Sequence, residues 1–208
     1  MSEDRVFSRI AHRYDRLNTV LSLGRDNAWR RRTAQFLPPG RVLDLGAGTG
    51  ASNDILGGRE IWALDPEPRM LALNPSSRRV VGVGEAIPFD DDWFDGVFSA
   101  FVLRNLSSVP ETLEEVARVL RPGGVVAIVD LARPPGRVRS SLHRAGTAVV
   151  LPAAGATIGA AGEYRYLHRT LDKLPPPQEL LTSGPLRLDS LWRMGPLGFV
   201  YGAVLRNV

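Results

Sequence analysis

A short apolar run followed by three alternating glycines places the strongest constraint on how this chain can fold. Residues 42–45 have the pattern of a buried strand, and Gly46, Gly48 and Gly50 follow them directly. Residues without a Cβ atom allow the backbone to turn sharply and allow a ligand to approach the main chain closely. The segment therefore predicts a strand, a tight turn and a helix whose first N–H groups face a ligand.

Strand signals alternate with helix signals through the middle of the chain. Apolar runs predict seven strands, at residues 41–45, 61–64, 80–83, 94–100, 125–129, 187–194 and 199–205. Ser108 and Glu111 have the spacing of a capping box and predict the start of a helix, which Pro122 and two following glycines are expected to end. The last two strands are close in sequence and should pair antiparallel. The fold class is therefore α/β, with a Rossmann-like, seven-stranded, mostly parallel sheet and an antiparallel last strand.

The 208 residues fit a single domain spanning 1–208. Residues 1–38 are expected to form N-terminal helices that cap the domain. Residues 136–183 are expected to form a helical insertion before the last two strands, over the carboxyl ends of the strands where such folds bind ligands. Within the insertion, residues 145–162 carry no charge. Their hydrophobicity is low for a membrane span, so we expect a helix pair broken at Pro152.

Composition and charge exclude several classes of protein. The chain has no cysteine, which excludes disulfides, thiolate zinc sites and iron–sulfur clusters, and we predict no metal site. The net charge is +4, but acidic residues are interspersed with the basic ones, so no nucleic-acid partner is expected. The first twenty residues are charged throughout and lack the apolar core of a signal peptide, which predicts a cytoplasmic location.

The glycine spacing also indicates the class of ligand. It is G-x-G-x-G, whereas the dinucleotide fingerprint is G-x-G-x-x-G. Asp44 stands two residues before the first glycine, which differs from the usual dinucleotide strand. Asp65 ends the second strand, where a carboxylate can accept both hydroxyls of a ribose, although it can also cap the next helical segment. The pattern favours S-adenosylmethionine over NAD, and a nicotinamide oxidoreductase is kept as a distant alternative.

Four further motifs occur along the chain. They are FSRIAHRYD at 7–15, GEAIPFDD at 84–91, FVLRNL at 101–106 and YRYL at 164–167. With these motifs the chain resembles the UbiE-type C-methyltransferases of ubiquinone and menaquinone biosynthesis, which are class I enzymes dependent on S-adenosylmethionine. The resemblance covers nearly the whole chain. It implies methylation of a ring carbon of a prenylated quinol, either demethylmenaquinol or a related ubiquinone precursor, with S-adenosylhomocysteine as the second product.

The resemblance also implies which residues hold the cofactor. They are Asp44, Gly46, Gly48, Thr49 and Gly50 at its amino-acid end, Asp65 at the ribose, and Val83 and Gly84 at the adenine. Val83 departs from the family, which usually has Asp or Asn there, so backbone groups or packing would have to hold the adenine. Ala100 stands where a Ser is common. These departures keep open an O- or N-methyltransferase of another small molecule, or a scaffold that has lost catalysis.

The catalytic residues follow from the chemistry that the resemblance implies. A ring carbon becomes a good nucleophile once a neighbouring hydroxyl has lost its proton. Arg104 is expected to stabilise the resulting oxyanion, or else to form a salt bridge. Asn105 is expected to orient a hydroxyl or a water, or else to cap the strand end. Tyr14 and Tyr166 are expected to join a water chain to Arg104, or else to pack as aromatic side chains, and no dedicated base is named.

The implied substrate carries a long isoprenoid tail, and residues 149–161 are expected to line a tunnel for it. Arg30 to Arg32 and the arginines of 137–144 are expected to rest against anionic headgroups, as a peripheral contact at the inner face of the membrane. An oligomer is compatible with the sequence.

Overall fold

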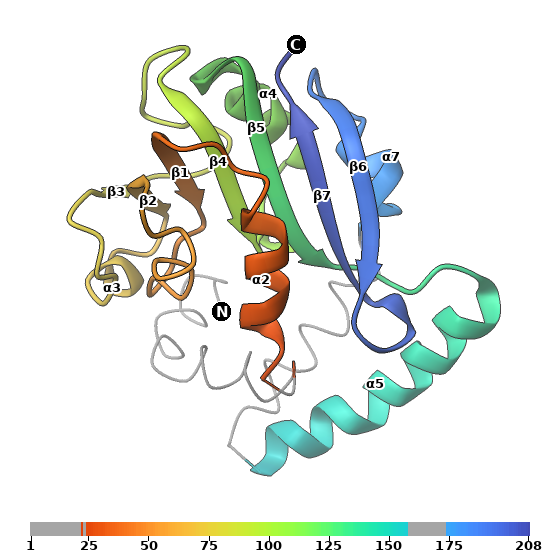
Figure 1. Ribbon diagram of the computed structural model, residues 1–208. Coiled ribbons are helices and arrows are strands. Elements are labelled where there is room, and N and C mark those ends of the chain that lie inside the picture. Colours follow the sequence, from red (N-terminus) through yellow and green to blue (C-terminus); the bar gives the residue numbers. More distant parts are fainter. Residues whose placement is uncertain (1–21, 23, 158–173) are drawn as a thin grey trace.

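The computed structural model describes residues 22, 24–157 and 174–208 of the chain (Figure 1). Its centre is one sheet of seven strands in the order β3-β2-β1-β4-β5-β7-β6. The strands are β1 (Arg41–Leu45), β2 (Glu60–Asp65), β3 (Arg79–Val81), β4 (Phe94–Ala100), β5 (Leu120–Leu131), β6 (Arg187–Met194) and β7 (Val200–Arg206). Pairing is parallel from β3 to β5, whereas β7 pairs antiparallel with both β5 and β6. The predicted α/β class, with its Rossmann-like parallel sheet and antiparallel last strand, is confirmed.

Helices cover both faces of the sheet. The described α-helices are α2 (Asp26–Ala34), α3 (Pro68–Leu71), α4 (Val109–Val119), α5 (Arg137–Thr157) and α7 (Pro177–Leu181). Two short 3-10 turns are η1 (Leu103–Asn105) and η2 (Pro196–Gly198). In Figure 1, α2 crosses one face of the sheet, α4 and α7 lie behind the other, and α5 extends away from the sheet. Among the described helices, none is both long and apolar enough to cross a membrane.

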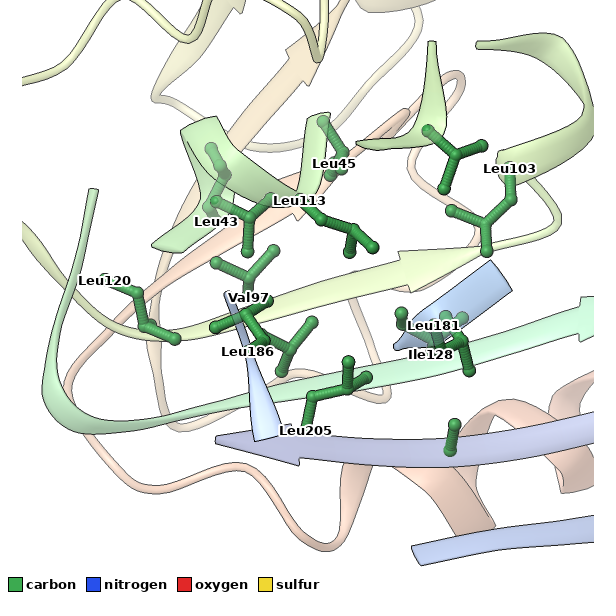
Figure 2. Close-up of a cluster of buried hydrophobic side chains, with 14 of the residues drawn as sticks. Leu43, Leu45, Val97, Leu103, Leu113, Leu120, Ile128, Leu181, Leu186 and Leu205 are labelled. Carbon is green, nitrogen blue, oxygen red and sulfur yellow. The ribbon is translucent and has the colours of Figure 1, made fainter. Parts of the chain in front are cut away.

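Alternate residues of the central strands divide the core into two layers. Val42 and Phe98 pack with Trp29 of α2 on one face, whereas Leu43 and Val97 pack against the other face. Figure 2 shows part of the second layer, including Leu45, Leu103, Leu113, Leu120, Ile128, Leu181, Leu186 and Leu205. Each fully buried side chain of this size contributes about 1.5–3 kcal/mol of transfer free energy. Burial on both faces explains why the central strands are nearly continuous apolar runs.

The helix predicted after the glycine turn is wrong for this chain. Residues 49–58 form successive turns, in which Asn53 N–H donates to the Gly50 carbonyl at 3.0 Å and Leu56 N–H to the Ser52 carbonyl at 2.9 Å. Only residues 51–59 separate the turn from β2, and two of them, Gly57 and Gly58, disfavour helix. Loop residues such as Thr49 and Ala51 therefore border a cavity that lies beside this turn.

The predicted break at Pro152 is also wrong, because α5 runs from Arg137 to Thr157 as one helix. A proline inside a helix removes one backbone hydrogen bond, and a helix can continue past it with a local bend. The predicted helix after Ser108 is confirmed, but it ends at Val119. Pro122 and the glycines that follow lie within β5, which starts at Leu120.

The start of α4 differs in one respect from a capping box. Ser108 Oγ accepts the N–H of Glu111 at 3.4 Å, as the motif predicts. The N–H of Ser108 donates to Glu85 at 3.0 Å, and the N–H of Ser107 donates to the same Glu85 oxygen at 2.7 Å. A carboxylate distant in sequence thus supplies the acceptor that Glu111 was expected to supply, and it ties residues 83–86 to the start of α4.

Candidate active site

The turn after β1 adopts a conformation that requires glycine. Gly46, Gly48 and Gly50 all have positive φ angles, of 69°, 52° and 88°. A Cβ atom on Gly46 would also overlap the side chain of Val102. The N–H groups of Gly46 and Ala47 donate to the Leu64 carbonyl at 2.8 and 3.0 Å, which fixes the turn against the end of β2. The predicted strand and tight turn are present.

A cavity of about 320 Å³ lies at the carboxyl ends of β1, β2 and β4, where open α/β sheets bind ligands. Seven of the residues predicted to hold the cofactor or to act in catalysis line it: Gly46, Gly48, Thr49, Asp65, Val83, Gly84 and Asn105. Asp44 is buried in β1 and, like Gly50, is not among the lining residues. Residues far apart in the chain, from the ends of three strands, therefore meet at one cavity, as the sequence predicted.

Asp65 is held in place at the end of β2 by backbone N–H groups. Its Oδ2 accepts from Gly48 and its Oδ1 from Glu67, both at 2.9 Å. Burial raises the pKa of Asp65, while these two hydrogen bonds lower it. Each carboxylate oxygen has a second lone pair, so the side chain can still accept hydrogen bonds from ligand hydroxyls in the cavity.

Asp44 is a buried carboxyl group with one unpaired oxygen. It is 2% exposed, and its Oδ2 has no hydrogen-bond partner within the described part of the chain. Burial raises the pKa of Asp44 from 3.8 to about 7, while the nearby Arg30 guanidinium lowers it. A cationic ligand group that binds nearby would favour the ionised form of this carboxyl group.

Arg30 lies in the cavity wall and not at the surface where the sequence predicted a membrane contact. It is buried, and its Nη1 donates to Ser52 Oγ at 2.7 Å. Its guanidinium lies 5.1 Å from the centre of the Phe101 ring, and the residue lines the cavity. Arg30 therefore cannot rest on membrane headgroups, whereas Arg31 and Arg32 are exposed. The sequence did carry a signal, because Asp26, Trp29, Arg30 and Thr33 fall on one helical face.

Phe101 directs the chain from β4 into η1 through an unusual backbone conformation. Its φ angle is 65°, which is rare for an aromatic residue and costs on the order of 1–3 kcal/mol. Its N–H donates to the Val129 carbonyl at 2.8 Å, and its own carbonyl accepts from Arg104 Nη1 at 3.0 Å. The turn that follows separates two cavities, since Asn105 lines the first and Arg104 lines the second.

The second cavity, of about 750 Å³, lies beside the carboxyl end of β5 and is bordered by α5 and by residues 174–177. Arg104, with a side chain 8% exposed, lies 3.6 Å from the buried carboxylate of Asp130. Burial raises the pKa of Asp130, and Arg104 lowers it. The salt bridge, which was the alternative to an oxyanion role for Arg104, is thus present, and it holds the guanidinium at the cavity wall. Tyr14 and Tyr166 lie outside the described residues.

The first cavity fits S-adenosylmethionine by its chemistry. The cofactor carries an ammonium group, a carboxylate, two ribose hydroxyls and an adenine. The cavity offers the Arg30 cation, the Asp65 carboxylate, and apolar surface from Leu64, Met70 and Val83, and the unpaired oxygen of Asp44 is buried in β1 next to the lining residue Leu45. These groups complement the charges and hydroxyls of the cofactor, although Val83 offers the adenine no polar side chain.

Comparisons with known proteins agree with this geometry. A model of the ubiE/COQ5 methyltransferase family matches residues 2–183. A demethylmenaquinone methyltransferase of Mycolicibacterium gilvum is 37% identical over 183 residues, which cover 84% of this chain and 80% of that protein. Another, of Thermus thermophilus, is 37% identical over 191 residues, covering 84% and 87%. A solved S-adenosylmethionine-dependent methyltransferase of Thermotoga maritima covers 98% of this chain and 99% of its own, with a TM-score of 0.65 and 14% identity, a likeness of fold alone.

Proposed function

Because this chain belongs to the ubiE/COQ5 methyltransferase family, we propose that it methylates a ring carbon of demethylmenaquinol or a closely related prenylated quinol. It is a methyltransferase that uses S-adenosylmethionine. The choice of acceptor rests on one observation: relatives 37% identical to this chain over most of its length are named demethylmenaquinone methyltransferases.

The residues of the first cavity are proposed to hold the cofactor. Bound S-adenosylmethionine supplies an electrophilic methyl group on a sulfonium centre. Asp65 accepts hydrogen bonds from the ribose hydroxyls. Asp44 attracts the ammonium group of the amino-acid end, and Arg30 attracts its carboxylate. The glycine turn, with Thr49, allows the backbone to approach the cofactor closely, and Val83 and Gly84 contact the adenine.

The turn η1, which lies between the two cavities, is proposed to position the acceptor. A quinol carbon attacks only when charge from an ionised hydroxyl reaches the ring, so the protein must favour the oxyanion and exclude water. Arg104 stabilises this oxyanion, and its pairing with Asp130 keeps the guanidinium from reorienting. Asn105, which lines the first cavity, orients a hydroxyl or a water. Tyr14 and Tyr166 are proposed to extend a water chain to Arg104.

Methyl transfer to an extractable lipid tests the proposed function. Purified protein is incubated with methyl-labelled S-adenosylmethionine and chemically reduced demethylmenaquinone, and the lipid is analysed by mass spectrometry. The expected result is a mass gain of one methyl group that depends on the reductant. The oxidised quinone serves as the matched control because it lacks an ionisable hydroxyl. An equal gain with the oxidised quinone, or no gain with the quinol, would contradict the proposal.

A peripheral contact with anionic membrane is proposed for the same protein. Arg31 and Arg32 on α2 are exposed, as are Arg137, Arg139 and Arg144 near the start of α5. Arg137 and Arg144 also line the second cavity. Each basic residue near an anionic surface contributes on the order of 1 kcal/mol. Flotation with liposomes containing anionic lipid is expected to carry the protein upward at low salt. Equal flotation with neutral liposomes, or none with either, would contradict this contact.

A further inference from the structure

Three neighbouring strands align a row of polar side chains on the wall of the second cavity. Tyr201 of β7 is paired with Asp130 of β5 on one side and with Arg193 of β6 on the other. Directly paired residues of a sheet point to the same face, so the three side chains lie next to one another. Arg104 extends the row, because its guanidinium lies 3.6 Å from Asp130. The order across the row is therefore cation, carboxylate, phenol and cation.

The hydroxyl of Tyr201 is buried without a hydrogen-bond partner. The residue is 1% exposed, and its Oη finds no partner in the part of the chain that the structure describes. Tyr201 nevertheless lines the second cavity together with Arg104 and Arg193. A buried hydroxyl without a partner destabilises a fold, and a phenylalanine would fill the same space without that cost. Because Tyr201 lines a cavity, which the equally unpartnered Ser99 does not, its hydroxyl is placed to donate to a ligand atom there.

The lining of the cavity carries a strong positive charge. Five arginines line it: Arg104, Arg133, Arg137, Arg144 and Arg193. No carboxylate is among its described lining residues, since Asp130 lies buried behind Arg104. The Arg193 guanidinium lies 5.9 Å from the centre of the Tyr201 ring, and its Nη1 donates to the Gly198 carbonyl at 3.2 Å. Such a lining favours an anion over a neutral molecule.

We infer that the second cavity binds the acceptor ring as its phenolate, with the Tyr201 hydroxyl donating to the ionised oxygen and Arg104 and Arg193 flanking it. This assignment rests on the proposed function and adds Tyr201 and Arg193 to it. In the step that they favour, the acceptor O–H bond breaks, the proton leaves to water, and the electron pair stays on the oxygen. Burial and the nearby Asp130 raise the pKa of Tyr201 well above its usual value, so this hydroxyl keeps its proton and remains a donor.

The charged and titratable groups that face this oxygen come from several elements. They are Arg104 after β4, Asp130 and Arg133 at the end of β5, Arg137 and Arg144 on α5, Arg193 on β6 and Tyr201 on β7. His143 of α5 contacts Arg133 at 3.2 Å. The arginines outnumber the carboxylate, so the cavity is expected to lower the pKa of a phenol bound in it.

Tyr201→Phe tests the hydroxyl with little change to the fold. The expected result is a loss of about tenfold or more in kcat/KM for the quinol, with an unchanged Kd for S-adenosylhomocysteine and an unchanged or higher Tm. Ser99→Ala is the matched control, since Ser99 also carries a buried hydroxyl without a partner but lines neither cavity. Unchanged kcat/KM in Tyr201→Phe, or a loss equal to that of Ser99→Ala, would overturn the inference.

A direct titration tests the anion site without methyl transfer. The probe is 4-nitrophenol, whose absorbance reports its ionisation. Bound to the wild-type protein, it is expected to ionise at a lower pH than in solution. Arg193→Gln should reduce this shift, and Arg193→Lys should restore most of it. An unshifted titration, or displacement of the probe by inorganic phosphate more readily than by a naphthol, would overturn the inference. A shifted titration in a protein that does not methylate the quinol would support the anion site and refute the proposed acceptor.

Discussion

The carboxyl group of Asp44 links protonation to stability. Burial raises its pKa from 3.8 to about 7, so it stabilises the fold while it is protonated and loses this contribution as pH rises through about 7. The free energy of unfolding should therefore fall by on the order of 4 kcal/mol between about pH 4 and about pH 8 from this group alone. Urea unfolding across this range should show a weaker pH dependence in Asp44→Asn. An equal dependence in both proteins would contradict the assigned pKa.

Val83, which we propose to contact the adenine, has no polar side-chain group to offer it. The side chain is 44% exposed and lines the cofactor cavity. Val83→Asn is expected to tighten binding of S-adenosylmethionine by about 2- to 10-fold, because one neutral hydrogen bond contributes about 0.5–1.5 kcal/mol. Isothermal titration calorimetry measures the change. Val81→Asn is the control, since Val81 is 56% exposed and does not line the cavity. Unchanged affinity in Val83→Asn would refute this account of the departure.

At the residue scale, side chains at the glycine turn were easier to predict than those that meet only in the folded sheet. Asp65 and the glycines follow strand ends, and strand ends are visible in the sequence. Tyr201 reads as an ordinary apolar strand residue. Its neighbour Asp130 comes from a strand distant in sequence and Arg193 from the preceding strand, and the register of the sheet places both beside Tyr201. No local pattern could show that its hydroxyl lacks a partner.

At the element scale, Glu85 connects the loop of the cofactor cavity to α4. Its carboxylate accepts the N–H groups of Ser107 and Ser108. Glu85→Ala leaves both donors without this acceptor and is expected to cost about 0.5–2 kcal/mol, as the loss of a helix cap does, which lowers Tm by a few degrees. It should also weaken cofactor binding, because Glu85 and Ser107 line the cavity. Thermal unfolding monitored by circular dichroism, with calorimetry for the cofactor, measures both effects.

Glu111→Ala is the matched comparison, because a conventional capping box would make Glu111 the more important residue. Glu111 is exposed, and its replacement by Ala is expected to lower the free energy of unfolding by less than about 0.5 kcal/mol. A larger loss of stability in Glu111→Ala than in Glu85→Ala would show that the conventional box operates.

Strands were predicted more accurately than the segments between them. Apolar runs buried on both faces mark β1, β2, β4 and β5 clearly. The helix expected after Gly50 failed because too few residues and two glycines lie before β2, and the break expected at Pro152 failed because a helix tolerates one missing hydrogen bond. Local sequence patterns indicate the secondary structure that a segment prefers. The number of residues between its flanking strands limits which structure it can form.

At the scale of the whole molecule, ligand binding should stabilise the fold. A ligand at about 100 times its Kd adds about 2.7 kcal/mol to the free energy of unfolding. For a chain of this size that corresponds to a rise in Tm of about 5–11 °C. S-adenosylhomocysteine is expected to produce this shift in the wild-type protein and a smaller one in Asp65→Ala at the same concentration. NAD should produce none, and a rise with NAD equal to that with S-adenosylhomocysteine would contradict the assignment of the first cavity.

The two cavities on either side of η1, proposed for the methyl donor and the methyl acceptor, are formed by strands from across the sheet. The first gathers the carboxyl ends of β1, β2 and β4, and the second gathers β5, β6 and β7. The spatial order β3-β2-β1-β4-β5-β7-β6 reverses between β1 and β4, within the first group, and open sheets form ligand sites at such a reversal. Methyl transfer to a ring carbon is the chemistry that we propose for this arrangement.

The position of the transferred methyl group tests that claim most directly. The protein is incubated with S-adenosylmethionine labelled with carbon-13 in its methyl group and with reduced demethylmenaquinone, and the product is examined by carbon-13 NMR. A label bonded to a ring carbon is the predicted result. A label bonded to oxygen would show that the chain is an O-methyltransferase and would contradict the account.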